Sequence, residues 1–371
     1  MASEALDSYL RALADAEGSD LHVKVGSPPR IRVNGVLRRI EGAPEIRPAD
    51  TDEMVRAIMR PDVFERFDRS SDSDFAYSVS GIGRFRANAF RQRGSIAMIF
   101  RMVRTSVDSF EDLGLPPVVA RLALEHRGLV LVTGPTGSGK TTTLAAMIDH
   151  INRTRECHIV TLEDPIEVLH DDYASSINQR EIGVDAENFS TAMRAAMRQD
   201  PDVILIGEMR DEETVAAALS AAETGHLVLS TLHTVDAAET VNRIVDFFSP
   251  HQQNQIRVAL AGTIKGTLCQ RLVPTVDGLG RVAALEIMVA NGRIQQCILD
   301  PQLTGEMHAI IADGEYYGMQ TFDQALIKLL EDGKIDMRGA MSAASQPHDL
   351  KVMLQQRGLL VSPRTVQPAP V

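Results

Sequence analysis

The sequence is poor in cysteine and has no long apolar run. Its three cysteines, Cys157, Cys269 and Cys297, lie far apart, which excludes a disulfide framework and a paired-cysteine zinc site. No apolar stretch approaches the ~20 residues that a membrane-spanning helix needs. Residues 1–18 have the pattern of an acidic amphipathic helix and lack the layout of a signal peptide. We therefore expect a cytoplasmic protein without direct membrane insertion, which reaches a membrane only through a partner.

An excess of positive charge is also missing. The formal net charge is −12, which argues against a nucleic-acid coat over the whole chain but allows a local basic patch. Charged residues at 24% and hydrophobic residues at 44% are typical of a globular protein. A chain of 371 residues is long enough for two domains, each with its own core.

The strongest functional signal is the stretch GLVLVTGPTGSGKTT at residues 128–142. Its apolar run, Leu129 to Val132, predicts a buried parallel strand, and a helix is expected to begin at Lys140. The loop between them fits the pattern G-x-x-x-x-G-K-[ST], in which backbone N–H groups and a helix N-terminus surround a phosphate. Lys140 would reach the β- and γ-phosphates of ATP, and the Thr141 hydroxyl would hold Mg²⁺. The expected nucleotide contacts are Gly134, Pro135, Thr136, Gly137, Ser138, Gly139, Lys140, Thr141 and Thr142.

Strands and helices alternate after this loop. Apolar runs at 158–164, 203–208 and 227–233 predict further parallel strands, so ligands are expected at their carboxyl ends. Two of these runs end in acids, Glu163 and Glu208. Hydrolysis of ATP needs one carboxylate to hold the metal and one to orient the attacking water. Glu208 suits the first role and Glu163 the second, and the opposite assignment stays open.

Two histidines bracket the last of these strands. His233 follows Ser230-Thr231 at the carboxyl end, where the γ-phosphate is expected, and His226 precedes the strand. For each histidine, a role in sensing phosphate competes with a purely structural role. A metal site shared by the pair would lack a third ligand nearby.

Residues 1–104 predict a small α+β domain. The Asn34-Gly35 pair between two β-like runs indicates a hairpin. Residues 84–104 contain no acidic residue, so their arginines form a solvated strand face or a contact for a polyanion. One candidate polyanion is the triphosphate bound by this subunit or by the next one, which the arginines would approach like an arginine finger. Nucleic acid is the third candidate, and the lack of stacking aromatic residues on the arginine face disfavours it. The arginines are Arg84, Arg86, Arg91, Arg93, Arg101 and Arg104.

Breakers mark the remaining boundaries. Gly114 and Pro116-Pro117 place a linker at 105–118, followed by the ATPase core with its C-terminal helices at 119–345. Within that core, residues 268–288 are expected to be β. Several prolines after residue 346 predict a flexible tail over 346–371.

Four motifs in this order resemble those of the secretion ATPase superfamily and, within it, the PilT-type retraction ATPases of type IV pili. They are the Walker A loop GPTGSGKTT, the aspartate box IVTLEDPIEVLH, the Walker B stretch RQDPDVILIGEMRD and the histidine box TGHLVLSTLHTVDAAETVNRIVDFF. The segments SDLHVKVGSPPRIRVNGVLRRI, GRFRANAFRQR and MQTFDQALIKLLEDG are also similar to that family. The resemblance therefore covers residues 1–335.

The resemblance implies a PAS-like N-terminal domain, a RecA-like α/β core with a parallel sheet, and assembly into a homohexamer. Glu163 would be the catalytic carboxylate, Glu208 the Walker B acid and His233 the sensor of the histidine box. Arg86 and Arg101 would carry arginine contacts to nucleotide. ATP hydrolysis would rotate the domains and drive type IV pilus retraction and twitching motility. The ring would act on an inner-membrane platform protein from the inner face of the cytoplasmic membrane, with other pilus ATPases as further partners and no nucleic acid.

Two departures from related families bear on the direction of the motor. Retraction ATPases have a late helix similar to AIRNLIRE, whereas the corresponding stretch here is NGRIQQCILD. Pilus-assembly and type II secretion ATPases have a larger N-terminal region and a four-cysteine zinc insertion, which this chain lacks, so the balance favours retraction. A pilus-assembly or secretion ATPase is the first alternative, and a nucleotide-gated binding module with little turnover is the second. A small-molecule kinase would need an acceptor site and a lid, for which no segment is evident.

Overall fold

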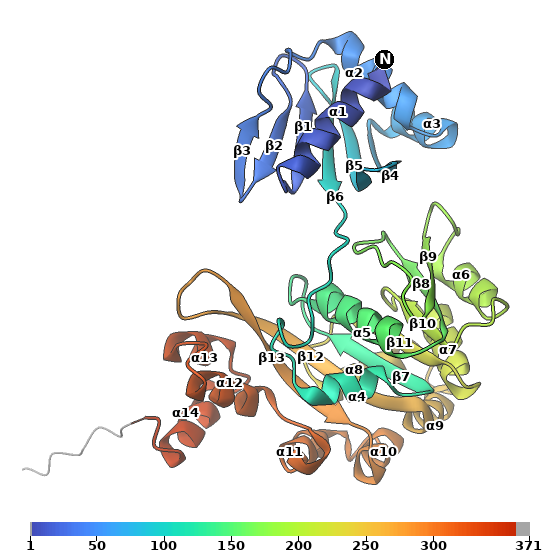
Figure 1. Ribbon diagram of the computed structural model, residues 1–371. Coiled ribbons are helices and arrows are strands. Elements are labelled where there is room, and N and C mark those ends of the chain that lie inside the picture. Colours follow the sequence, from blue (N-terminus) through green and yellow to red (C-terminus); the bar gives the residue numbers. More distant parts are fainter. Residues whose placement is uncertain (1, 361–371) are drawn as a thin grey trace, which may run out of the picture. The chain divides into compact units, whose positions relative to one another are not determined.

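The protein consists of two compact units in a computed structural model that describes residues 2–360. The division falls between Thr105 and Ser106 (Figure 1). Each unit has its own sheet and its own hydrophobic core.

The first unit packs helices onto an antiparallel sheet (Figure 1). Asn34 and Gly35 have φ angles of 49° and 79°, the left-handed geometry of a tight turn, and join two strands in the expected hairpin. The strands follow the order β3-β2-β1-β6-β5-β4. Their bounds are β1 (Asp20–Lys24), β2 (Arg30–Val33), β3 (Val36–Arg39), β4 (Asp72–Val79), β5 (Gly83–Gln92) and β6 (Ser95–Met102), and the helices are α1 (Ala2–Asp15), α2 (Pro48–Ile58) and α3 (Pro61–Ser70).

Alternation along the strands separates the two faces of this sheet. Phe85, Ala87 and Ala89 of β5 are buried in one cluster with the leucines of α1. The alternate position Arg86 lies directly opposite Arg101 of β6, so these two arginines share the other face. The arginine-rich segment is therefore a pair of neighbouring strands.

The second unit is built on a seven-stranded sheet in the order β13-β12-β7-β11-β10-β8-β9. Neighbouring strands are parallel, except that β12 and β13 form an antiparallel hairpin. Leu129 and Leu131 of β7 face one core cluster while Val130 and Val132 face the other, which explains the continuous apolar run. The bounds are β7 (Gly128–Thr133), β8 (His158–Glu163), β9 (Ser176–Glu181), β10 (Val203–Ile206), β11 (Leu227–Leu232), β12 (Ile264–Pro274) and β13 (Arg281–Val289).

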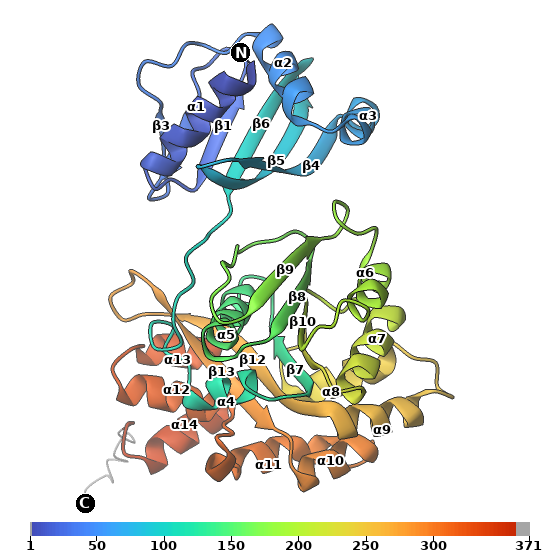
Figure 2. The same cartoon turned by 45° about the vertical axis from the view of Figure 1, so that its right-hand side comes forward.

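Helices cover both faces of this sheet (Figure 2). One face packs against α4 and α5, and the other against α6 to α9 and the C-terminal helices. The helices are α4 (Pro117–Ala123), α5 (Lys140–Thr154), α6 (Phe189–Ala196), α7 (Glu212–Glu223), α8 (Ala237–Asp246), α9 (Gln253–Thr263), α10 (Gly292–Leu299), α11 (Met307–Ala312), α12 (Phe322–Glu331), α13 (Met337–Ala343) and α14 (Pro347–Gln356), with 3-10 turns η1 (Thr304–Glu306) and η2 (Glu315–Tyr317).

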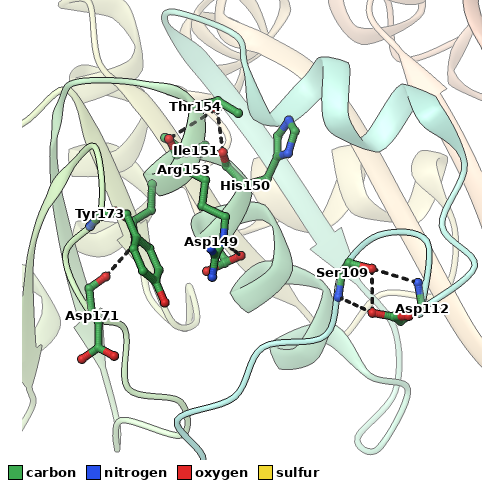
Figure 3. Close-up of polar contacts among 10 residues, drawn as sticks. Ser109, Asp112, Asp149, His150, Ile151, Arg153, Thr154, Asp171 and Tyr173 are labelled. Carbon is green, nitrogen blue, oxygen red and sulfur yellow. Dashed lines mark hydrogen bonds and ion pairs between the residues drawn. The ribbon is translucent and has the colours of Figure 1, made fainter.

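The segment expected to be a linker at 105–118 is largely part of the second unit. Phe110 and Leu115 are buried in a core cluster of that unit, and α4 begins at Pro117. The Ser109 hydroxyl donates to the Asp112 carboxylate at 2.7 Å, which closes a tight turn beside α5 (Figure 3). The apolar side chains of this segment pack into the core despite its glycine and proline residues. The second unit therefore begins at Ser106, earlier than the predicted end of the linker at residue 118.

The prediction of a flexible tail at 346–371 is wrong for the first part of this segment. Residues 347–356 form α14, with Pro347 in the first turn, where a missing N–H costs nothing. Leu350 and Leu354 lie one turn apart on this helix and are fully buried in the main core cluster. Residues 361–371 lie outside the described part of the chain.

Candidate active site

The expected site residues converge on one edge of the second sheet because parallel strands end on the same side. Thr133 of β7 lies opposite Leu232 of β11, and Ile206 of β10 lies opposite Leu162 of β8. The phosphate-binding loop, His233, Glu208 and Glu163 thus follow successive strands across this edge, about 4.8 Å apart per strand. The expected site residues therefore lie at the carboxyl ends of the parallel strands, where ligands of such sheets bind.

The loop between β7 and α5 has room only for glycine at two positions. Gly134 and Gly139 have φ angles of 142° and 91°, and a Cβ at either one would lie within 2.7 Å of neighbouring atoms. The Ser138 side chain is buried, and its Oγ has no hydrogen-bond partner among residues 2–360. A tight glycine loop with a buried, unpaired hydroxyl at a helix N-terminus fits the phosphate chain of a nucleotide.

Lys140, at the first position of α5, lies over the loop. Its Nζ donates to the carbonyl oxygens of Gly134 at 2.8 Å and Pro135 at 3.2 Å. Burial lowers the pKa of Lys140, and the negative charges of Glu208 and Glu167 partly oppose this effect. The influence of Glu208 on Lys140 links the loop electrostatically to the acid that follows β10.

Pro135, Thr136 and Gly137 form the exposed crest of the loop. Thr141 is exposed and Thr142 half-buried in the first turn of α5. Both threonines therefore lie where the helix N-terminus can present hydroxyl groups to an anion and its metal.

Glu208 lies between two side chains that can carry positive charge. One carboxylate oxygen, Oε2, pairs with Nη2 of Arg210 at 2.7 Å, and the other, Oε1, contacts Nε2 of His233 at 3.1 Å. Partial burial acts to raise the pKa of Glu208, but the Arg210 hydrogen bond and charge together with His233 lower it overall. Glu208 is therefore an ionised carboxylate at neutral pH, which suits a metal-side role.

Glu163 ends β8 and is a different kind of carboxyl group. Its Oε1 accepts hydrogen bonds from Oγ1 of Thr161 at 2.6 Å and from Nε2 of Gln179 at 3.2 Å. Burial raises the pKa of Glu163, although these two hydrogen bonds oppose the rise. Two acids on one sheet edge thus have pKa values shifted in opposite directions, as is common where two carboxyl groups have different tasks.

His226 does not join this edge. It precedes β11 at the opposite end, where its carbonyl accepts from the N–H of Gly128 at 2.9 Å. The length of β11, about 20 Å at 3.3 Å per residue, separates it from His233. The Nδ1 atom of His226 lies 3.0 Å from the carbonyl oxygen of Ala221 in α7. Within one chain, His226 therefore lies apart from the other expected catalytic residues, and its role in catalysis stays a prediction.

The expected arginines, Arg86 and Arg101, belong to the first unit. Nε of Arg101 donates to Oδ1 of Asp20 at 2.9 Å, and Asp20 is buried. Arg32 of the next strand lies 3.7 Å from the same carboxylate. One acid thus anchors part of a basic row that crosses β5, β6, β1 and β2.

Three side chains that contact Glu208 or Glu163 were not predicted from the sequence. They are Arg210, Thr161 and Gln179. Arg210 could have been found, because a cation two residues after a strand-end acid can fold back onto it. Thr161 also has a signal, since alternate residues of a strand share a face. Gln179 lies on the polar edge strand β9, whose residues SINQRE do not predict a strand.

Two of the expected site residues offer oxygen donors for a metal ion. Residues 2–360 contain no group of three or more His, Cys, Asp or Glu side chains that could hold a metal alone. Thr141 and Glu208 supply oxygen donors of the kind that Mg²⁺ accepts together with phosphate oxygens and water. Within the same residues, no helix is long and apolar enough to cross a membrane.

Comparison with known proteins identifies the family of this chain. The model of the family described as Type II/IV secretion system protein matches residues 3–315. The chain belongs to this family. The chain is 43% identical over 331 residues to the Type IV pilus retractation ATPase PilT of Pseudomonas aeruginosa, covering 89% of this chain and 95% of that protein. It is also 43% identical over 322 residues to a Twitching motility protein of Neisseria gonorrhoeae, covering 87% and 86%.

One solved structure is similar to this chain in fold. The crystal structure of the pilus retraction motor PilT with bound ADP matches with a TM-score of 0.84 and 43% identity, covering 93% of this chain and 99% of that chain. The predicted resemblance to PilT-type ATPases and the α/β fold with a RecA-like core are therefore confirmed. The PAS-like character of the first unit and the roles of the site residues stay predictions.

Proposed function

We propose that this protein is an ATPase motor that retracts type IV pili and so supports twitching motility. It is an ATPase of the secretion family, similar to PilT over most of its length. The observation that carries the proposed mechanism is the 3.1 Å contact between Glu208 and His233, on neighbouring strand ends beside the phosphate-binding loop. A passive nucleotide binder would not need an acid and a histidine held together at that place.

Each residue of the sheet edge has one role in the proposal. The loop and Lys140 bind the triphosphate of ATP. Thr141 and Glu208 would hold Mg²⁺, which would supply positive charge that neutralises the phosphate chain of ATP. Glu163 orients the attacking water and accepts its proton, a task for which a raised carboxyl pKa is suited. His233, through its contact with Glu208, responds to the presence of the γ-phosphate.

The motor proposed here is a homohexameric ring. Head-to-tail contacts in a ring place the surface of one subunit beside the nucleotide of the next, and in this proposal the exposed side chains of Arg86 and Arg101 contact that nucleotide. Hydrolysis rotates the first unit against the second, and the ring acts on a platform protein in the inner membrane. We propose that the protein works from the cytoplasmic side of that membrane, with other pilus ATPases as further partners.

The biochemical test compares turnover in three variants with the wild type. Lys140→Ala and Glu208→Gln are expected to lower kcat by about 100-fold or more, because each removes charge stabilisation at the reacting phosphate. Lys265→Ala is the matched control, since Lys265 pairs with Glu125 at 3.6 Å at the amino end of β12. Equal residual turnover in the wild type and both site variants would refute an ATP-driven motor and favour the nucleotide-gated module.

The cellular test decides the direction of the motor. Cells that lack the protein should assemble surface pili but fail to retract them, and Glu208→Gln should not restore retraction. Cells without surface pili would instead support the pilus-assembly alternative.

A further inference from the structure

Gln270 of β12 lies under the phosphate-binding loop. We propose that it is a positioning residue that holds the loop in its nucleotide-binding shape and thereby sets the affinity for ADP and ATP. This inference rests on the proposed function, because it requires the loop to bind nucleotide. No motif in the sequence marks Gln270, which comes 130 residues after Lys140.

The pairing of β12 with β7 brings Gln270 to the loop. Cys269 lies opposite Thr133, the last residue of β7, so the next residue of β12 runs beside Gly134. Gln270 is only 2% exposed. A buried amide at this place must have hydrogen-bond partners, or its burial would destabilise the fold.

The two ends of the Gln270 amide bind two parts of the nucleotide site. Its Nε2 donates to the carbonyl oxygen of Ser138 at 2.8 Å, and its Oε1 accepts from Oγ1 of Thr143 at 2.8 Å. Ser138 belongs to the loop and Thr143 to the first turn of α5. The side chain therefore fastens the loop to the helix whose N-terminus faces the phosphates.

The loop glycines make room for this side chain as well as for phosphate. A Cβ at Gly139 would lie 2.7 Å from Nε2 of Gln270, and a Cβ at Gly134 would lie 2.4 Å from the carbonyl oxygen of Gln270. Either contact is too short for real atoms. Gly134 would thus be required even if nucleotide made no demand on it, because the atom in its way belongs to the backbone of β12.

The hydrogen bond to Ser138 also determines where an N–H group points. The carbonyl of Ser138 and the N–H of Gly139 belong to one peptide group, which is planar and trans, so they point in opposite directions. Holding the carbonyl toward Gln270 therefore directs the Gly139 N–H to the other side of the loop, where phosphate is expected. Loss of the bond frees this peptide to rotate, and binding must then fix it again.

The test measures the Kd of a fluorescent ADP analogue in Gln270→Glu and Gln270→Leu. At pH 8 the carboxylate of the glutamate variant can still accept a hydrogen bond from Thr143. Its second oxygen has no proton to donate and repels the carbonyl oxygen of Ser138, so we expect Kd to rise about tenfold or more. Lowering the pH to about 6 protonates part of this buried carboxyl group and restores the donor, so the affinity relative to wild type should recover. The leucine variant should lose affinity at both pH values. The ratio of variant to wild type at each pH cancels the effects of groups that titrate in both proteins.

Gln320→Glu is the matched control. Nε2 of Gln320 donates to the carbonyl oxygen of Leu285 at 2.9 Å, so the same substitution breaks the same kind of bond away from the loop. Its Kd should stay within about twofold of wild type. If the Gln270 variants do not fold, Thr143→Val should raise Kd while Thr143→Ser does not, because only the serine keeps the hydroxyl group.

Three outcomes are decisive, and they separate this inference from the proposed function. If the wild type binds the analogue, Lys140→Ala does not, and both Gln270 variants bind within about twofold of wild type at pH 8, the role of Gln270 is refuted alone. A glutamate variant whose Kd ratio does not change with pH refutes it too. If the wild type and Lys140→Ala both fail to bind, the proposed function is refuted together with this inference.

Discussion

Replacing Thr161 by valine should shift the pH dependence of ATP hydrolysis without removing any group that touches substrate. The Thr161 hydroxyl donates to Glu163 at 2.6 Å, in a buried place where a bond to a charged acceptor is strong. Such a bond contributes about 1.5–3 kcal/mol to the ionised form. At 1.36 kcal/mol per unit, its loss should raise the pKa of Glu163 further by about one to two units.

The sign of the effect on rate follows from the role of Glu163. A general base is active when ionised, so activity is present above its pKa and is lost as the pH falls through it. Because burial already raises the pKa of Glu163, the wild type should lose activity at a higher pH than an ordinary glutamate allows. In Thr161→Val this acid limb of kcat against pH should move upward by about one to two units.

The assay is steady-state phosphate release between pH 5 and 9 at saturating ATP. Thr263→Val serves as the control, because its buried hydroxyl donates to the carbonyl oxygen of Ala259 at 2.7 Å, at the amino end of β12. An acid limb that stays in place in a folded Thr161→Val variant, or moves downward, would show that Glu163 is not the base.

Three further outcomes concern single contacts. Arg210→Gln should raise the pKa of Glu208 but cost less than about 1 kcal/mol of unfolding free energy in urea, because the guanidinium is largely exposed; a larger cost would indicate a structural ion pair. Leu350→Ala should lower the unfolding free energy of the second unit by about 2–5 kcal/mol, measured in denaturant, whereas no change would mean that α14 is not docked. Asp20 is paired with Arg101. Burial acts to raise the pKa of Asp20, but the hydrogen bonds from Ser19 and Arg101 outweigh burial and lower this pKa overall. This contribution to stability is present above the unfolded carboxyl pKa of about 3.9 and is lost as the pH falls through the lower folded value, so Asp20→Asn should flatten the acid side of the wild-type stability profile.

Local chemistry explains what could be predicted from the sequence. The loop at Gly134 and Gly139 needs backbone angles and space that only glycine allows, and it therefore leaves a fixed pattern. The hairpin at Asn34 and Gly35 is the same kind of case, in which two residues define the turn. The apolar runs of β7, β8, β10 and β11 have no polar face because helices cover both sides of the sheet.

The missed features depend on contacts between distant segments. Gln270 reaches the loop only because β12 pairs with β7, and no local pattern encodes that pairing. Helix α14 begins at Pro347 in a segment whose prolines predict a flexible tail, and the burial of Leu350 and Leu354 shows that it packs. His226 and His233 flank the same strand, and the rule that ligands bind at the carboxyl ends of parallel strands already places only His233 near the nucleotide.

Strand β12 is fixed in register from both sides. Gln270 faces the loop, while its neighbour Arg271 donates to the carbonyl oxygen of Ala343 at 2.7 Å and stacks over the ring of Phe322 at 4.0 Å. Inserting or deleting one residue before this pair would exchange the two faces, placing a guanidinium under the phosphates and an amide among the C-terminal helices. We therefore expect length changes to be tolerated in the turn at 275–280 but not within β12, even where point substitutions are mild.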